Sequence, residues 1–464
     1  MEATAGDRIP RRAVAGYAAG SVGTGGFGTL PGLVLAYYLT DTLAVPALLA
    51  TVVVIVPKVW DVLIDPAVGA LSDREVAARH TRTRLMVLGA VTLPIGFIGM
   101  FAAPTGLPPV VSGLWVLAFF LLATTSFSLF QVPYIALPAD LTGDYAERTR
   151  LMAWRIAVLA LAILLVGAGG PAVRDAAGGD AGGYLAMGVV IAVLLVGGML
   201  GTVWGVRRRA SAIGPILPNN ARRAVRPSPQ NGEYRVGLVA LREIPAYRVL
   251  LVAFVLQALA TGVMLAAAQY VARYTLDDQG ALTFLFAALV GPALLVMPLW
   301  TRYAARTGKR PAFAAASVLF VLACLALVGL AWAPGWWVYL PVALAGVGYA
   351  GMQLFPLAML PDVISAAGRE RGGAMSGLWT AGETAGLALG PAVVLVMLAV
   401  GGFRSSTGGQ TLVQPDAAHL LIVLAFSLVP ALLVGLSLIV LRSYREPTNR
   451  PTDSTAPTSS EVTP

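Results

Sequence analysis

The sequence predicts an all-α polytopic membrane protein, with twelve transmembrane helices in two pseudo-symmetric bundles of six. Three observations indicate this class: a scarcity of charge, twelve long apolar stretches and an internal repeat. Of the 464 residues, 57% are hydrophobic and 12% are charged, and the mean hydropathy is +0.78. Soluble proteins carry about 25% charged residues. This chain therefore has too few charges to cover a surface that faces water.

The apolar stretches are long enough to cross a bilayer, which takes about 20 helical residues. Each must be helical, because lipid offers no partner for free backbone groups. The predicted spans are 14–39, 46–71, 84–104, 110–138, 151–171, 184–206, 249–272, 281–301, 312–332, 336–364, 374–401 and 419–442.

The basic residues predict the orientation. With the N-terminus inside, only Arg174, Arg273 and Arg404 of the 32 Lys and Arg fall in outside loops, and Lys58 and Arg155 fall within spans. The others lie in inside segments, and such an asymmetry predicts that both termini are cytoplasmic in a cell membrane, plasma or inner. The net charge of +9 is thus a topology signal, and no nucleic-acid partner is expected.

The longest connection between spans divides the chain. We expect an N-terminal bundle at 1–206, a cytoplasmic central loop at 207–248, a C-terminal bundle at 249–442 and a disordered cytoplasmic tail at 443–464, which is rich in Pro, Ser and Thr.

The two predicted bundles share a sequence pattern. QVPYIALP at 131–138 matches LFPLAMLP at 354–361, and a Glu-Arg pair follows at 147–148 and at 370–371, all at an offset of 223. Two parallel repeats are typical of secondary transporters, whose binding sites lie near the midplane between the repeats.

Three charges stand inside the second span, in the stretch KVWDVLIDP at 58–66. Lys58, Asp61 and Asp65 follow the spacing i, i+3, i+7, which places them on one helix face. A charge at the bilayer centre costs at least about 3 kcal/mol, so this face must turn inward. One interpretation is a structural Lys58–Asp61 pair that locks the helix to a neighbour. That pair leaves Asp65 unmatched, and free carboxylate oxygens instead favour a cation site.

Other polar groups are embedded in later spans, among them Ser128 and Gln131 in the fourth. Arg155 in the fifth span is a candidate substrate partner, or it forms a static pair with Asp61 or Asp65. Glu383, in TAGETAG, is a candidate site group of the second half, or it hydrogen-bonds a helix end.

Acidic and basic residues also meet at the predicted cytoplasmic ends of the spans. We interpret them as gate residues rather than ligands, because each acidic residue has an arginine close by. The set is Asp73, Arg74, Asp140, Arg148, Asp362 and Arg371.

Two long stretches closely resemble a known family. KVWDVLIDPAVGALSDR at 58–74 and VPYIALPADLTGDYAERTRLMAWR at 132–155 resemble the glycoside–pentoside–hexuronide:cation symporters. These form the melibiose-permease-like branch of the major facilitator superfamily. YYLTD at 37–41 and GLWTAGETAGLALGP at 377–391 fit as well. The resemblance covers nearly the whole chain and implies the major facilitator fold.

The resemblance also implies roles for individual residues. Asp61 and Asp65 would be cation ligands, and Ser128 stands where the family has a hydroxyl ligand. Gln131 occupies a position that is Asp in melibiose permease, and it completes the predicted cation-binding set. Arg155 matches an arginine near the sugar site.

The predicted substrate-binding set departs further from the family. Gly25 falls where melibiose permease has a sugar-binding Asp, Ile135 replaces a tryptophan beside the sugar, and Thr384 stands where many members have Lys. The cation half of the pattern is thus better kept than the sugar half. The full predicted set is Lys58, Arg155, Gly25, Ile135, Glu383 and Thr384.

The function predicted from these observations is secondary active transport by alternating access. We expect symport of a small solute, such as a sugar or glycoside, with Na⁺ or H⁺; the alternative is a proton-driven exporter of a hydrophobic or drug-like compound or a lipid. With two histidines and one cysteine, no metal cluster or enzyme activity is expected, nor any cofactor beyond the coupling ion. The expected partners are the substrate, the coupling cation and the bilayer, with the monomer functional.

Overall fold

The computed structural model describes residues 9–79, 81–142, 145–212, 239–278, 280–367, 372–407 and 412–445. Within these ranges the chain is a succession of long helices, and its β structure is one isolated bridge between Leu43 and Thr407. The helices of the first half are α1 (Arg11–Tyr37), which continues as a π-helical turn (Tyr38–Thr42), α2 (Ala47–Arg79), α3 (Thr83–Phe101), α4 (Pro109–Leu141), α5 (Tyr145–Ala176) and α6 (Ala181–Ala212). Those of the second half are α9 (Pro245–Tyr270), which continues as a π-helical turn (Val271–Thr275), α10 (Ala281–Thr307), α11 (Lys309–Ala326), α12 (Tyr339–Ala367), α13 (Gly372–Val400), α14 (Asp416–Phe426) and α15 (Leu428–Arg442).

The helices have the length and apolarity of membrane spans. Eleven stretches of described helix are long and apolar enough to cross a membrane. The remaining long helix, α1, is less apolar because it carries several glycines, and α14 and α15 form a single span that breaks at Ser427. The predicted all-α polytopic fold is confirmed.

Several helices extend beyond the predicted spans. α6 continues to Ala212, residues 239–243 are helical and α9 begins at Pro245, so helix occupies both ends of the predicted loop at 207–248. Helical hydrogen bonds remain favourable in water where the residues are good helix formers such as Ala and Arg, so apolarity does not mark the helix end. Residues 213–238, and 446–464 of the predicted tail, lie outside the described residues.

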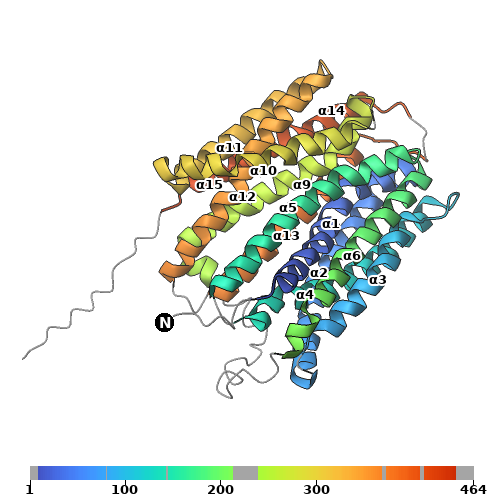
Figure 1. The fold of residues 1–464 in the computed structure, drawn as a ribbon. Helices are drawn as coiled ribbons and strands as arrows, with labels where there is room; N and C mark the ends of the chain where they lie inside the picture. The colour runs from blue at the N-terminus through green and yellow to red at the C-terminus, as the bar shows by residue number, and fades with distance from the viewer. Residues whose placement is uncertain are drawn as a thin grey trace, which may run out of the picture.

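The helices form two bundles that lie side by side. In Figure 1 the blue-to-green helices gather on one side and the yellow-to-red helices on the other. The bundles touch where α2 meets α13, α5 meets α10 and α1 meets α9. We call the end of the molecule where α1 begins the Arg11 end, and the opposite end, where the π-helical turn follows α1, the Asp41 end.

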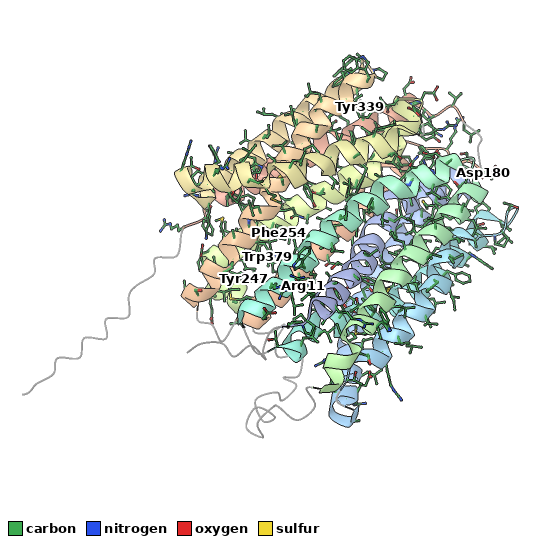
Figure 2. All side chains as sticks on the ribbon, viewed as in Figure 1. Arg11, Asp180, Tyr247, Phe254, Tyr339 and Trp379 are labelled. Atoms are coloured by element: carbon green, nitrogen blue, oxygen red, sulfur yellow. The ribbon has the colours of Figure 1, made fainter. Side chains whose placement is uncertain are left out.

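Within the second bundle, α9 and α13 approach closely. A Cβ atom on Gly262 would lie 2.5 Å from the Leu387 carbonyl oxygen, so only glycine fits there without a shift. Nearer the Arg11 end the rings of Phe254 and Trp379 stack, with centroids 4.4 Å apart, and the Tyr247 hydroxyl donates to the Met375 carbonyl at 2.6 Å (Figure 2). Contacts along its length therefore fix α13 to α9.

The close crossing predicts a specific sensitivity. Gly262→Ala should destabilise the protein by about 1–3 kcal/mol, the usual cost of overpacking, because the new methyl group meets backbone that cannot yield. The matched control is Gly377→Ala on α13, where an added Cβ meets nothing within 4 Å. Thermal unfolding in detergent measures both. Equal melting temperatures for the two variants would contradict the close crossing.

Candidate functional site

The charges of α2 meet α4 in the middle of the first bundle. The Lys58 Nζ lies 3.8 Å from Asp61 Oδ2, and the Ser128 hydroxyl lies 3.4 Å from Asp61 Oδ1. Ser128 is also within hydrogen-bonding reach of Asp65. The side chains of Lys58 and Asp61 are 30% and 19% exposed. The predicted Lys58–Asp61 pair therefore exists, but it stands in an accessible site that also holds a second carboxylate.

Gln131 adds a further acceptor one turn along α4 from Ser128. Its Oε1 is buried and has no hydrogen-bond partner among the described residues. Asp61, Asp65, Ser128 and Gln131, together called the carboxylate site below, offer the oxygen ligands that a hard cation prefers. Oxygen ligands about 2.4 Å from a Ca²⁺-sized ion stand about 3.4 Å apart at right angles, which matches the Ser128–Asp61 separation. The role of these residues as cation ligands stays a prediction.

Arg155 lies among aromatic rings rather than carboxylates. Its guanidinium carbon is 5.4 Å from the centre of the Tyr134 ring, which in turn stacks on Tyr17 at 4.9 Å. The Tyr134 hydroxyl donates to the Tyr17 carbonyl at 2.8 Å, whereas the Tyr17 hydroxyl is buried and has no hydrogen-bond partner among the described residues. In the described part of the chain no carboxylate forms an ion pair with Arg155. The proposed static pair with Asp61 or Asp65 is therefore not formed in this structure.

A cavity of about 410 Å³ lies between the two bundles. Residues of α1, α5, α9, α10, α12 and α13 form its wall. The polar side chains in the wall are Thr29, Thr261, Tyr349 and Gln353, and the rest of the lining is apolar, including Ile156, Ile163, Phe286, Leu289, Val290 and Met297. This space, called the central cavity below, suits the apolar part of a ligand.

None of the six predicted substrate-binding residues is part of the cavity wall. A Cβ on Gly25 would lie 3.0 Å from Leu159 Cδ1, so Gly25 packs against α5. Ile135 is 49% exposed on α4, and Thr384 is exposed on α13. The structure places Ser128 against Asp61 beside Asp65, whereas the Gln131 amide oxygen has no hydrogen-bond partner among the described residues. The predicted substrate set is spread over several places, and the roles of both sets stay predictions.

Glu383 lies beside the central cavity. It lines a small recess that shares Thr261, Tyr349, Gln353 and Leu387 with the cavity wall. Lys58 belongs instead to the carboxylate site, and Arg155 to the aromatic group around Tyr134.

The predicted gate residues are described only in part. Asp362 forms an ion pair of 2.5 Å with Lys309, which joins α12 to α11 inside the second bundle. Arg74 is exposed. The side chains of Asp73, Asp140 and Arg148, and all of Arg371, lie outside the described residues.

Sequence reasoning missed a group of polar residues that joins the two bundles at the Asp41 end. The Tyr274 hydroxyl donates to the carboxylate of Asp41, which is 5% exposed. The hydroxyls of Thr40 and Tyr270 are 2.8 Å apart. The Ser406 amide donates to the Thr40 carbonyl at 2.9 Å. These bonds close the two bundles against each other.

Arg174 adds a further contact between the two bundles at this end, and its position differs from the prediction. The charge pattern assigned Arg174 to an outside loop, but it lies in the last turn of α5 and is 1% exposed. Its Nη1 donates to Gln269 Oε1 of α9 at 2.8 Å, and Asp175 pairs with it at 2.6 Å. We call Thr40, Asp41, Arg174, Gln269, Tyr270 and Tyr274 the Asp41 clamp. In the sequence, the motif YYLTD at 37–41, which contains Thr40 and Asp41, is the only pattern that indicates the clamp.

The fold and the carboxylates inside it define a secondary transporter of the major facilitator class. The chain belongs to the family described as MFS/sugar transport protein, whose model matches residues 16–446. It is 25% identical to an uncharacterized symporter of Synechocystis sp., over 91% of this chain and 92% of that protein. It is 23% identical to the sodium-dependent lysophosphatidylcholine symporter 1-A of Danio rerio, over 90% of this chain and 82% of that protein.

Solved structures agree on the fold. A crystal structure of a D-xylose–proton symporter has a TM-score of 0.63 and 13% identity, over 95% of this chain and 98% of that one. At that identity the likeness shows the fold alone. The predicted resemblance to cation symporters of the major facilitator superfamily is confirmed, and the chain is a transporter rather than an enzyme.

The Asp41 clamp predicts a shift between conformations. Tyr274→Phe removes the donor to the buried Asp41 carboxylate, and leaving a buried acceptor unpaired costs about 1–3 kcal/mol. The population of the conformation in which the Asp41 end is closed should fall about tenfold relative to conformations in which that end is open. Spin labels at Thr105 and Trp336, exposed at this end on opposite bundles, should report longer distances by pulsed electron resonance.

The matched control for this measurement is Tyr339→Phe, which removes a hydroxyl at the same end but outside the clamp (Figure 2). Both variants carry Cys324→Ala, so that the labels occupy the introduced cysteines alone. Identical distance distributions for Tyr274→Phe and Tyr339→Phe would show that the clamp does not hold the two bundles together.

Proposed function

We propose that this protein is a cation-coupled secondary transporter of an amphipathic molecule with a long apolar part. The observation that carries the proposal is the central cavity, which has a volume of about 410 Å³ and a largely apolar wall. It lies between the two bundles, where transporters that work by alternating access bind their substrates.

The chemistry of the wall favours an acyl chain over a sugar. Each buried methylene group contributes about 0.8 kcal/mol when it leaves water. A buried hydroxyl without a hydrogen bond costs about 1–3 kcal/mol, and only four polar side chains line the cavity. The predicted sugar or glycoside substrate thus finds few partners there. The printed name of the zebrafish relative, a lysophosphatidylcholine symporter, agrees with an amphipathic substrate.

The carboxylate site would supply the coupling. Binding a Na⁺ or a proton at Asp61 and Asp65 neutralises charge on α2, the helix that contacts α13 of the other bundle. Occupancy of the site would therefore act at an interface that must move when the bundles rock. The cation and the substrate would bind at different places, on α2 and α4 for the cation and in the central cavity for the substrate.

The distribution of basic residues predicts which end of the molecule faces the cytoplasm. Under the positive-inside rule, the Arg11 end faces the cytoplasm together with both termini, and the Asp41 end faces outward from a cell membrane. In that orientation the clamp would close the outward end. The monomer contains both bundles and the whole cavity, and it would be the functional unit.

The substrate class is testable in proteoliposomes. Ala160→Trp should lower uptake of a fluorescent lysophospholipid at least tenfold, because Ala160 lines the cavity and an indole would fill it. The matched control is Leu161→Trp, the next residue of α5, which is 51% exposed and absent from the cavity wall. Two results together would overturn the proposal of an amphipathic substrate. The unmodified protein would show no lysophospholipid uptake, and it would transport a β-galactoside at a rate that Ala160→Trp leaves unchanged.

Coupling is tested by removing charge from α2. Asp61→Asn and Asp65→Asn should each abolish accumulation driven by an imposed Na⁺ or H⁺ gradient, because the uncharged amide no longer exchanges a cation. Ser128→Ala should weaken the dependence on the cation only a few-fold. Asp416→Asn, at an exposed position of α14, serves as the neutral control. Full accumulation by both α2 variants would assign Asp61 and Asp65 a structural role only.

A further inference from the structure

The recess beside the central cavity has an unusual chemical composition. It is lined by Gln257, Ala258 and Thr261 of α9, by Tyr349, Met352 and Gln353 of α12, and by Glu383 and Leu387 of α13. Its volume is about 10 Å³, which is room for one group of the size of a water molecule. It shares four lining residues with the central cavity, so the two spaces are adjacent.

The amide of Gln257 is oriented by its neighbours. Its Nε2 donates to Ser317 Oγ and to Ser437 Oγ, each at 3.0 Å, which ties α9 to α11 and α15. The Oε1 must then point away from both serines. This oxygen is buried on a side chain that is only 3% exposed, and it has no partner among the described residues. A buried acceptor without a donor is costly, so this position favours a ligand that can satisfy it.

Glu383 places a carboxylate at the same recess. The Gln353 amide lines the same recess and donates to the Tyr349 hydroxyl at 3.0 Å. Among the described ion pairs none includes Glu383. The recess thus combines a carboxylate, a free amide oxygen and the hydroxyls of Thr261 and Tyr349, and it has acceptors in excess of donors.

The geometry points to a second cation site, in which the Glu383 recess binds a small cationic group between α9, α12 and α13. Water would satisfy Gln257 but would leave the charge of Glu383 uncompensated in a medium of low dielectric constant. A proton on Glu383 would remove the charge and supply a single donor, which is fewer than the acceptor oxygens that line the recess. A small cation would compensate the charge of Glu383 and also satisfy the acceptor oxygens, because such ions prefer a mixture of charged and neutral oxygen ligands.

Two sources can supply this group. One is an inorganic ion such as Na⁺, which would be independent of the carboxylate site on α2. The other is a primary ammonium at the head of a bound amphipath, and this source rests on the proposed function. A quaternary ammonium is too large for a space of about 10 Å³, so size separates the two kinds of head group.

The first arm of the test measures ²²Na⁺ binding to the full chain in nanodiscs, in an Asp61→Asn, Asp65→Asn background that lacks the first site. We expect saturable binding to persist in this background. Glu383→Gln, of nearly the same shape, should weaken it at least tenfold, and Thr261→Val a few-fold. Glu383→Asp should retain part of it, and Asp416→Asn should leave it unchanged.

The second arm uses two lysolipids that differ only in the head group, in the otherwise unmodified chain. If the ammonium is the source, Glu383→Gln should weaken binding of the ethanolamine form at least tenfold and leave the choline form unchanged. If ²²Na⁺ binding and ethanolamine-lysolipid binding are both insensitive to Glu383→Gln, the second cation site is overturned. Neither arm requires transport, so failure of the proposed transport function would be recognised separately.

Discussion

A charge inside a bilayer must find a partner within the protein, and this constraint organises the molecule. On α2 the carboxylate of Asp61 faces Lys58 and the Ser128 hydroxyl. At the Asp41 end, Asp41 accepts from Tyr274, and Arg174 is held by Gln269 and Asp175. Most of these partners come from a different helix, so satisfying the charge also fixes how helices are arranged. At Glu383, which forms no ion pair among the described residues, the same constraint underlies the proposed second cation site.

The sequence predicted the features that depend on local periodicity. Apolar length alone predicts the spans, because a backbone in lipid must be helical, and the spacing of Lys58, Asp61 and Asp65 alone predicts a shared face. The clamp and the cavity depend instead on residues far apart in the chain, such as Thr40 and Tyr270, which are 230 positions apart. Arg174 was assigned to a loop because the apolar run ends before it, whereas α5 continues to Ala176.

The carboxylate site and the central cavity are formed by different helices. The carboxylate site lies on α2 and α4, while α1, α5, α9, α10, α12 and α13 enclose the central cavity. The two are linked where α2 packs on α13, the helix that also carries Glu383. In the proposed mechanism, a change of charge on α2 would reach the cavity wall through this one helix contact. Because α13 is fixed to α9 at Gly262 and at the Phe254–Trp379 stack, it would transmit that change as a rigid element.

The closure at the Asp41 end also includes main-chain bonds, and these have a consequence for how the family can vary. The Ala44 amide donates to the Ser406 carbonyl and the Ser406 amide donates to the Thr40 carbonyl, each at 2.9 Å. Such pairing does not depend on which side chains are present. The exposed positions of the loop that carries Ser406, such as Arg404 and Thr407, are thus free to diverge in sequence and to acquire new surface chemistry. The seal beneath them, which also includes the bond from the Ser406 hydroxyl to the Asp41 carbonyl, stays intact. Proline is the exception, since it lacks the amide hydrogen.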